Sequence, residues 1–270
     1  MYVPAMELRG KTALLTGATG GLGRAIAHAL AERGATLVLS SRKGDELTEL
    51  AESLPGAGHR TIVCDLAVEG SALRLLEDAG DIDALVANAG LPGSGRLDSF
   101  TQDEIERALR VNLESPVRMA RELVPKMVER GSGHLVFLSS VSGKAATARA
   151  SIYAATKFGL RGFAFCLRDD LRKTGVGVSV VSPGSIRDAG MFADSGAKPP
   201  PGVGMGTPEQ VAAGVVKAIE RDRREITVAP LRQRALVRIA INAPELSSRI
   251  SGGLAARVAD EIARGQTHKR

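Results

Sequence analysis

The sequence predicts an α/β fold: a single Rossmann-like domain whose doubly wound parallel sheet has about seven strands, with helices on both faces. Three observations predict this class. Short runs rich in Val, Ile, Leu and Ala alternate with longer stretches of helical period. The runs are apolar at consecutive positions, as expected of parallel strands covered on both faces. Glycine-rich and polar segments directly follow the runs, and such sheets bind ligands beyond the carboxyl ends of their strands.

Each apolar run is interpreted as a strand and each periodic stretch as a helix. The predicted strands are Thr12–Thr16, Thr36–Ser40, Thr61–Cys64, Ala84–Ala87, His134–Ser139, Gly177–Val181 and Glu225–Ala229. The predicted helices are Gly21–Arg33, Asp45–Ser53, Ser71–Asp78, Gln102–Arg130, Ile152–Thr174 and Pro208–Arg221. Right-handed crossovers between successive strands then give the doubly wound arrangement.

The stretch Ala189–Thr207 has no period and mixes Gly, Pro and small polar residues. We expect a mobile loop there. It is either a plain connector or a lid over the mouth of the site, because long loops in compact domains commonly serve binding. Its residues Met191, Phe192 and Pro199–Pro201 point to an apolar pocket.

The composition is that of a soluble globular protein: of 270 residues, 44% are hydrophobic and 24% charged, which suits one large domain. The apolar stretches are too short to span a bilayer, and Met1–Gly10 lacks the apolar core of a signal peptide. We therefore expect a cytoplasmic protein. The four histidines are scattered, and Cys64 and Cys166 fit no metal-ligand spacing, so we expect no metal site and two small core cysteines.

The formal net charge of +6 is concentrated near the C-terminus, where the last fifty residues hold 11 Lys/Arg against 5 Asp/Glu. We therefore separate a catalytic domain at 8–230 from a basic extension at 231–270, partly helical, with a last helix near Leu254–Ala263 beyond Pro244. A balanced body with 3% aromatic residues and no Trp argues against nucleic-acid binding. The extension is interpreted as solvated or subunit-contacting, and peripheral contact with anionic lipid is the alternative.

The first predicted strand leads into a glycine-rich turn and then a helix. Glycines let the backbone approach a pyrophosphate, and the helix N-terminus offers unpaired N–H groups and a favourable dipole. The turn predicts a dinucleotide site at Gly17, Thr19, Gly20, Gly21, Leu22 and Gly23.

The second predicted strand ends at Ser41 and Arg42. Arg42 stands 19 residues past Gly23, where an NAD site would place an acid that holds the ribose 2′-OH. A guanidinium can instead clamp a 2′-phosphate in bidentate fashion, so the sequence favours NADP over NAD.

Tyr153 and Lys157 are four residues apart at the start of a predicted helix, so their side chains share one face. A nearby ammonium favours the phenolate, and we expect the pKa of Tyr153 to lie below its ordinary value of about 10, where it suits acid–base catalysis. The preceding strand leads to Ser139 and Ser140, whose hydroxyls can hydrogen-bond a substrate oxygen.

Over about residues 8–230 the sequence resembles the classical short-chain dehydrogenases/reductases. The family's motifs occur in order. The cofactor-side motifs are TGxxxGxG at Thr16–Gly23, the adenine-binding Asp65 followed by Leu66, and the NAG motif at Asn88, Ala89 and Gly90. The later motifs are the helix asparagine at Asn112, the set Ser140, Tyr153 and Lys157 with spacings of 13 and four residues, and the pair Pro183 and Gly184. The resemblance implies a Rossmann-like oxidoreductase in which these positions bind the cofactor or catalyse.

The resemblance also implies a role for each catalytic residue. Ser140 holds and polarises the carbonyl oxygen, and Tyr153 donates a proton to the nascent alkoxide. Lys157 lowers the tyrosine pKa and contacts the nicotinamide ribose, and Asn112 positions a water that links Lys157 to solvent. Hydride passes between the nicotinamide of NADP(H) and a carbonyl or secondary alcohol carbon.

Two positions depart from the family pattern. Gly20 stands where NADP-preferring members often have a basic residue, so the NADP preference rests on Arg42 alone. Asp188 stands where the family often has the threonine that holds the cofactor amide. We therefore expect the backbone of Ile186 to bind that amide.

The predicted substrate is a lipophilic small molecule: a ketone, a steroid-like compound or a 3-oxoacyl thioester. The sequence does not choose among these substrates, nor between reduction and oxidation. The resemblance implies a homodimer or homotetramer packed through the two long helices, Gln102–Arg130 and Ile152–Thr174. The alternative function is a catalytically idle dinucleotide-binding regulator or scaffold, which would not need the intact set of Asn112, Ser140, Tyr153 and Lys157.

Overall fold

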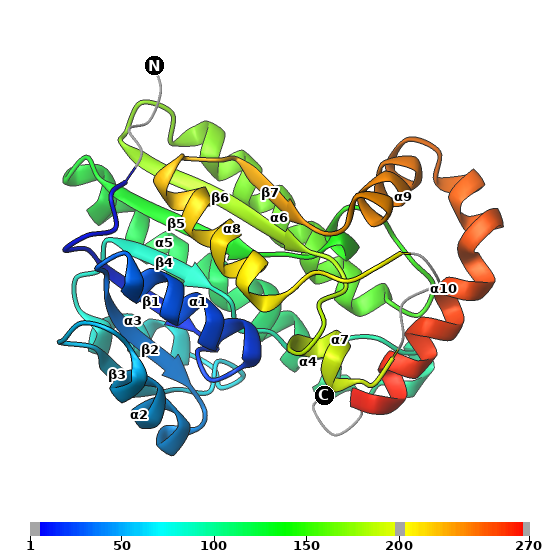
Figure 1. Ribbon diagram of the computed structural model, residues 1–270, viewed down its shortest axis with the longest axis horizontal. Helices are drawn as coiled ribbons and strands as arrows, with labels where there is room; N and C mark the ends of the chain where they lie inside the picture. Colours follow the sequence, from blue (N-terminus) through cyan, green and yellow to red (C-terminus); the bar gives the residue numbers. More distant parts are fainter. Residues whose placement is uncertain (1–5, 198–202, 267–270) are drawn as a thin grey trace.

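A computed structural model describes residues 6–197 and 203–266, which form seven strands in one parallel sheet with the order β3-β2-β1-β4-β5-β6-β7 (Figure 1). The strands are β1 (Thr12–Thr16), β2 (Thr36–Ser41), β3 (Arg60–Val63), β4 (Ala84–Ala87), β5 (Gly133–Leu138), β6 (Val176–Pro183) and β7 (Glu225–Val228). Every adjacent pair is parallel. The predicted doubly wound sheet is confirmed, and each strand lies within two residues of its predicted bounds.

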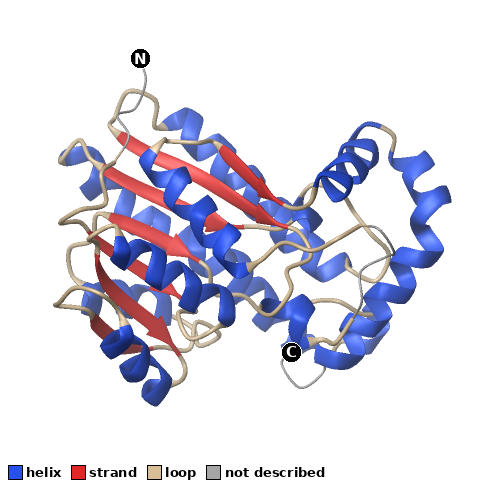
Figure 2. Ribbon diagram, in the orientation of Figure 1, coloured by secondary structure: helices blue, strands red, loops and turns tan. Residues whose placement is uncertain are grey.

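Helices cover both faces of the sheet (Figure 2). They are α1 (Gly21–Glu32), α2 (Gly44–Ser53), α3 (Ser71–Ala79), α4 (Gln102–Leu109), α5 (Ser115–Glu129), α6 (Ser151–Asp170), α7 (Gly190–Asp194), α8 (Pro208–Glu220), α9 (Leu231–Asn242) and α10 (Pro244–Gln266), with the short turns η1 (Leu97–Ser99), η2 (Arg110–Glu114) and η3 (Val141–Gly143). Buried side chains of α1, α2 and α8 form one apolar core. Those of α3, α5 and α6 form the other, on the opposite face.

Two of the helices begin at capping boxes that the sequence encodes. Thr101 accepts a hydrogen bond from the N–H of Glu104 at the start of α4, and the Glu104 carboxylate accepts one from the N–H of Thr101. Thr207 and Gln210 make the same reciprocal pair at the start of α8, which has Pro208 in its first turn. These caps fix where the two helices begin.

The strand order reverses between β1 and β4. The chain builds the sheet outward from β1 to β2 and β3, and then returns to place β4 on the other side of β1. Loops at the carboxyl ends of β1 and β4 therefore diverge, which leaves a crevice between them where doubly wound proteins bind ligands.

Some predicted elements need correction. The predicted helix Gln102–Arg130 contains a π-helical turn, η2, between α4 and α5. The predicted helix Ile152–Thr174 ends at Asp170. Within the predicted loop Ala189–Thr207 lies a short helix, α7, while Pro199–Pro201 fall outside the described residues.

The cysteines and the C-terminal segment also differ from expectation. Cys166 is exposed and Cys64 is only partly buried, so neither is a core residue; both are free thiols. The last helix begins at Pro244 rather than near Leu254, because proline is tolerated in a first turn. No helix in the described part of the chain is long and apolar enough to cross a membrane.

Candidate active site

The glycine-rich turn joins β1 to α1 and lies against the loop that follows β4. Gly17 has φ +65°, and a Cβ at this position would lie 2.8 Å from Ala89 Cα. A Cβ on Gly23 would lie 2.2 Å from the Gly17 carbonyl oxygen. Asn88 Nδ2 donates to the carbonyl oxygens of Thr16 at 3.0 Å and Gly17 at 3.1 Å. Only glycines permit this tight turn, which Asn88 fixes from the neighbouring strand.

The N-terminus of α1 has no side-chain cap. Gly20 is the N-cap residue and has no side chain that could accept a hydrogen bond from the helix. The first N–H groups of α1 therefore remain available to a ligand. A Cβ on Gly21 would lie 2.4 Å from Ala189 Cβ, so the segment after β6 crosses directly over this helix terminus. The two segments together form one side of the crevice.

The ends of β2 and β3 bring the remaining predicted cofactor residues to the same edge. Thr19 Oγ1 donates to Ser41 Oγ at 3.0 Å, which ties the glycine turn to the end of β2. Arg42 is exposed beside this contact. Asp65 Oδ1 accepts a hydrogen bond from the N–H of Ala67 at 2.9 Å, and the buried Leu66 follows it.

Ser140, Tyr153 and Lys157 lie together at the carboxyl end of β5. Ser140 caps η3, where its Oγ accepts a hydrogen bond from the N–H of Ser142 at 3.1 Å. Tyr153 and Ser140 line the same cavity, and the Ser140 side chain is near enough to the phenol to lower its pKa. Lys157 Nζ lies 5.6 Å from the centre of the Tyr153 ring and donates to the Leu138 carbonyl oxygen at 2.8 Å. The two hydroxyls and the ammonium therefore share one small region.

Burial dominates the acid–base properties of this cluster. It raises the pKa of Tyr153 to about 12, and the Ser140 side chain opposes that rise. Burial also lowers the pKa of Lys157 to about 8. The expected lowering of the tyrosine pKa by Lys157 is therefore wrong for this geometry, in which the ammonium is directed at the Leu138 carbonyl.

Asn112 lies in the π-helical turn η2 and is fully buried. Its Oδ1 accepts from the N–H of Leu91 at 2.7 Å, and its Nδ2 donates to the Leu91 carbonyl at 2.9 Å. Both ends of the amide thus hold the loop after β4, next to Gly90. A Cβ on Gly90 would lie 3.4 Å from Asn112 Oδ1 and 3.8 Å from Lys157 Nζ. The side chain of Asn112 is therefore an anchor, and the predicted water-positioning role stays a prediction.

The segment after β6 passes from Pro183 and Gly184 to a short parallel bridge between Ile186 and Gly206. That bridge uses the carbonyl of Ser185 and the N–H of Arg187, so the N–H and carbonyl of Ile186 face the opposite side. The Ile186 residue lines the cavity described below. Asp188, in contrast, is exposed and lies 3.2 Å from Arg187 Nε, on the solvent side.

These segments surround a cavity of about 320 Å³. Ser140, Tyr153 and Lys157 line it together with Leu22 and Asn88 from the side of the glycine turn. Among its described lining residues Lys157 carries the only formal charge. The remaining wall is largely apolar and comes from the segment after β6, from α7 and, unexpectedly, from α10.

Sequence reasoning missed the glycines that position Tyr153. The carbonyl of Gly93 accepts a hydrogen bond from the N–H of Tyr153, and a Cβ on Gly93 would lie 2.9 Å from that nitrogen. The N–H of Gly95 donates to the carbonyl of Arg149 at 2.6 Å. The loop after β4 therefore holds the start of α6. The two glycines follow the NAG motif closely, which is the signal that could have identified them.

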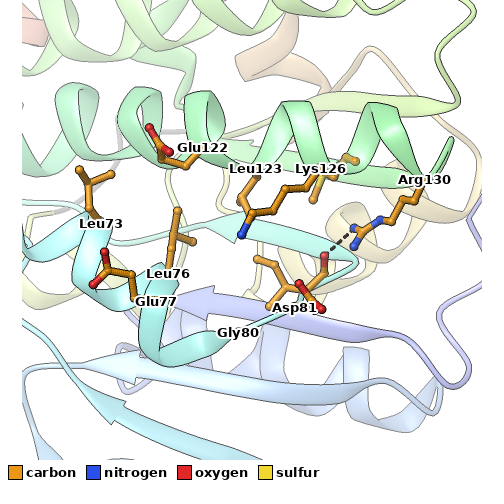
Figure 3. Close-up of a pocket in the computed structure, with 11 residues that line it drawn as sticks. Leu73, Leu76, Glu77, Gly80, Asp81, Glu122, Leu123, Lys126 and Arg130 are labelled. Carbon is orange, nitrogen blue, oxygen red and sulfur yellow. Dashed lines mark hydrogen bonds between the residues drawn. The ribbon is translucent and has the colours of Figure 1, made fainter.

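A second pocket, of about 190 Å³, lies between α3 and α5, away from the catalytic cluster (Figure 3). Arg130 donates to the Ile82 carbonyl at 2.5 Å across one end of it, and Lys126 and Glu122 stand along the α5 side. It contains no hydroxyl or imidazole that could accompany these charges in catalysis. Within residues 6–197 and 203–266, no three His, Cys, Asp or Glu side chains are grouped to hold a metal ion.

Comparisons with known proteins agree with this geometry. The family described as short chain dehydrogenase matches residues 11–199. The ketoacyl reductase HetN of Nostoc sp. is 38% identical over 227 residues, covering 82% of this chain and 79% of the relative. The dehydrogenase/reductase SDR family member 7B of Bos taurus is 31% identical over 262 residues, covering 90% and 81%. A structure of the 3-oxoacyl (acyl-carrier-protein) reductase of Agrobacterium tumefaciens with NADP bound superposes with a TM-score of 0.75 at 26% identity, covering 82% of this chain and 93% of that one.

Proposed function

Because the chain belongs to the short-chain dehydrogenase family, whose members are oxidoreductases acting on carbonyl and alcohol groups, we propose that it is an NADPH-dependent reductase of an uncharged, lipophilic carbonyl compound. The observation that carries the proposal is the pair of Ser140 and Tyr153 beside Lys157, in one cavity that extends to Leu22 and Asn88 at the glycine turn. A cofactor-binding regulator without chemistry has no use for this pair, and no observation favours it.

The glycine turn fits a dinucleotide. Cβ atoms on Gly17, Gly21 or Gly23 would collide with neighbouring atoms, so the turn keeps its surface free of side chains beside the uncapped terminus of α1. Residues that would hold the cofactor are Gly17, Thr19, Gly20, Gly21, Leu22, Gly23, Ser41, Arg42, Asp65, Leu66, Asn88, Ala89, Gly90, Tyr153, Lys157, Pro183, Gly184 and Ile186. When bound, NADPH supplies the hydride that reduces the carbonyl carbon. The Ile186 backbone, facing away from its bridge partner, is suited to bind the cofactor amide.

The residues of the site supply the proton and the electrostatic stabilisation. With a pKa of about 12, Tyr153 is a neutral phenol at physiological pH and can donate its proton to the oxygen of the reduced carbonyl. Ser140 Oγ lines the same cavity and can donate to the same oxygen, which stabilises its negative charge. The Lys157 ammonium, 5.6 Å from the centre of the Tyr153 ring, supplies the positive charge of the site. The raised tyrosine pKa favours the reductive direction.

The cavity limits the substrate. Its single formal charge among the described residues belongs to Lys157, so a substrate carboxylate or ammonium inside it would find no partner beyond the catalytic cluster. Ketones, steroid-like compounds and the oxoacyl part of thioesters satisfy this condition. HetN is named a ketoacyl reductase, and the structural neighbour is named an oxoacyl reductase; both names support an oxoacyl substrate. The NADP bound in that neighbour supports NADP as the cofactor.

NADPH consumption in the presence of a carbonyl panel tests the proposal. Uncharged aliphatic, alicyclic and aryl ketones and an oxoacyl thioester are compared with keto acids of similar size, each with NADPH and with NADH. We expect uncharged ketones to be reduced with NADPH at rates well above those of the keto acids. Consumption with no member of the panel, or only with the keto acids, would refute the proposal.

The NADP preference has its own test in Arg42. Replacing Arg42 with Ala removes the exposed guanidinium beside the end of β2, and we expect NADPH affinity to fall by about 10-fold or more because a bidentate charge-assisted contact is lost. NADH affinity should change less than twofold. The matched control is Lys43→Ala, since the Lys43 ammonium is already paired with Glu46. Equal loss of affinity for both nucleotides in Arg42→Ala would contradict the assignment.

We also propose that the enzyme is cytoplasmic and assembles as a homodimer or homotetramer through α5 and α6. The outer face of α6 exposes the small residues Ala155, Gly159 and Gly162 around Phe158, which is 41% exposed. Small residues allow close approach of two helices, and an exposed aromatic ring gains from burial at such a contact. Sedimentation of the purified protein measures the subunit number.

A further inference from the structure

Helix α10, within the C-terminal extension 231–270, runs back to the cavity, which it lines with Val258, Ala259 and Ile262. In Figure 1 it runs from beside α9 back to α7, near the end of the described chain. A Cβ on Gly265 would lie 2.3 Å from the carbonyl oxygen of Ser195, the residue that follows α7, so the last turn of α10 is in direct contact there. Ala259 and Ala263 of the same helix are buried. The helix is therefore packed on the body.

A second attachment joins α10 to the start of α6. Asp260 Oδ1 lies 3.0 Å from Nε of Arg149, two residues before α6 begins. Arg149 has φ +63°, and its carbonyl accepts the hydrogen bond from Gly95. The ion pair thus connects α10 to the same loop junction that positions Tyr153.

Between these attachments α10 presents apolar side chains to the cavity. Val258, Ala259 and Ile262 line it, and their spacing of one and four residues places them on one face of the helix. Met191 and Phe192 of α7 line the adjoining wall. The wall at η3 and the start of α6 carries the hydroxyls of Ser140 and Tyr153. The part of the cavity lined by α7 and α10 is therefore apolar, and the hydroxyls lie on other elements.

We propose that α10 is part of the substrate site, where Val258 and Ile262 form the wall that receives the apolar body of the substrate and limits its size. This inference rests on the proposed function. A carbonyl compound bound with its oxygen at Ser140 and Tyr153 extends toward α7 and α10, because the other wall offers hydroxyls. Helix α10 of the basic C-terminal extension thus selects uncharged substrates by the size of their apolar part.

The test places a large side chain on the inner face of α10. Ile262→Trp fills the cavity, and Glu261→Trp is the matched control, since Glu261 is exposed on the same turn. The probe is an uncharged naphthyl ketone whose fluorescence shifts in apolar surroundings, titrated in the presence of NADPH. We expect Ile262→Trp to weaken probe binding at least fivefold and Glu261→Trp to change it less than twofold. NADPH affinity should stay within twofold in both variants.

Equal probe binding by Ile262→Trp and the wild type would overturn the inference, as would a wild type that does not bind the probe at all. Loss of NADPH affinity in Ile262→Trp would overturn it too, by placing this position in the cofactor site. If Ile262→Trp does not fold, Ile262→Ala serves instead. It should raise the ratio of kcat/KM for a bulky ketone to that for a small one at least threefold, and an unchanged ratio refutes the wall.

The two proposals fail in different ways. Probe binding that responds to Ile262→Trp without any NADPH consumption refutes the reductase function and leaves the binding wall in place. If kcat/KM for ketone reduction does not change with the size of the side chain at position 262, the reductase function stands and the role of α10 is refuted.

Discussion

At neutral pH, Tyr153 and Lys157 are both protonated, the first as a neutral phenol and the second as a cation. Tyr153 stays protonated because burial raises its pKa to about 12, and Lys157 is mostly an ammonium because its lowered pKa is still about 8. Tyrosine as proton donor and lysine as cation are the forms that carbonyl reduction needs. Burial is the main cause of both pKa shifts, and it gives the two residues the protonation states that reduction of a carbonyl requires.

The pH profile of ketone reduction follows from these two values. The Tyr153 proton is present throughout the range below about 12, so it does not limit the rate between pH 6 and 10. The Lys157 charge is complete well below about 8 and is lost as pH rises through that value. We expect kcat/KM for NADPH-dependent reduction to be level from pH 6 to 7 and to fall above about 8. A profile that rises between pH 7 and 9 would contradict the assignment of Lys157 as the required cation.

The sequence identified the chemistry of individual residues better than their surroundings. The spacing of Ser140, Tyr153 and Lys157 predicted three groups that the fold does bring together. The direction of the Tyr153 pKa shift could not be predicted, because it depends on how deeply the phenol is buried and on where Lys157 points. Both depend on packing between β5 and α6, which one-dimensional spacing does not encode.

At the scale of elements, the loop after β4 connects the glycine turn to the catalytic helix. Asn88 holds the turn, Asn112 holds Leu91, and Gly93 holds the first turn of α6. The π-helical turn η2 delivers Asn112 into this loop. A periodicity pattern predicts helix through Gln102–Arg130, and one widened turn changes that pattern too little to be recognised.

Gly93→Ala tests this connection. The added methyl would lie 2.9 Å from the Tyr153 nitrogen, and since that nitrogen is backbone, the loop or α6 must move. A displacement of reacting groups costs up to about 100-fold in rate, so we expect kcat to fall about 10- to 100-fold while NADPH affinity changes little. Steady-state kinetics and fluorescence titration measure the two quantities.

The matched control for this variant is Gly253→Ala. Gly253 is exposed within α10, with nothing within 4 Å of a Cβ, so alanine should leave kcat unchanged and stabilise the protein by up to about 1 kcal/mol. If Gly93→Ala retained full activity, the loop after β4 would not position Tyr153.

At the scale of the whole molecule, the fold was predictable because each strand of a parallel sheet is a local apolar run. Strands such as Thr12–Thr16 and Ala84–Ala87 were predicted at their observed bounds. The contact of α10 with α7 and with Arg149 was not, since it joins segments about seventy and more than a hundred residues apart. Local patterns record that a segment is amphipathic and do not record which distant surface it covers.

Long-range contacts also include a buried ion pair that joins α6 to the turn before β7. Both carboxylate oxygens of Asp222 accept hydrogen bonds from Arg168 at 2.7 Å, and the Asp222 side chain is 3% exposed. Asp222→Asn leaves a guanidinium without its counter-charge, and we expect it to lower the free energy of unfolding by roughly 3 kcal/mol. Asp169→Asn removes an exposed partner of Arg172 and should cost less than about 1 kcal/mol. Urea denaturation compares the two, and equal effects would contradict a structural role for the buried pair.

Tyr153→Phe tests most directly whether Tyr153 donates the proton in an NADPH-dependent reduction. The substitution removes one oxygen and keeps the ring beside Lys157. We expect kcat for the best ketone of the panel to fall by about 10²–10⁴-fold, as loss of a general acid requires, with NADPH affinity within twofold of wild type. Turnover within threefold of wild type, at unchanged NADPH affinity, would show that another group supplies the proton.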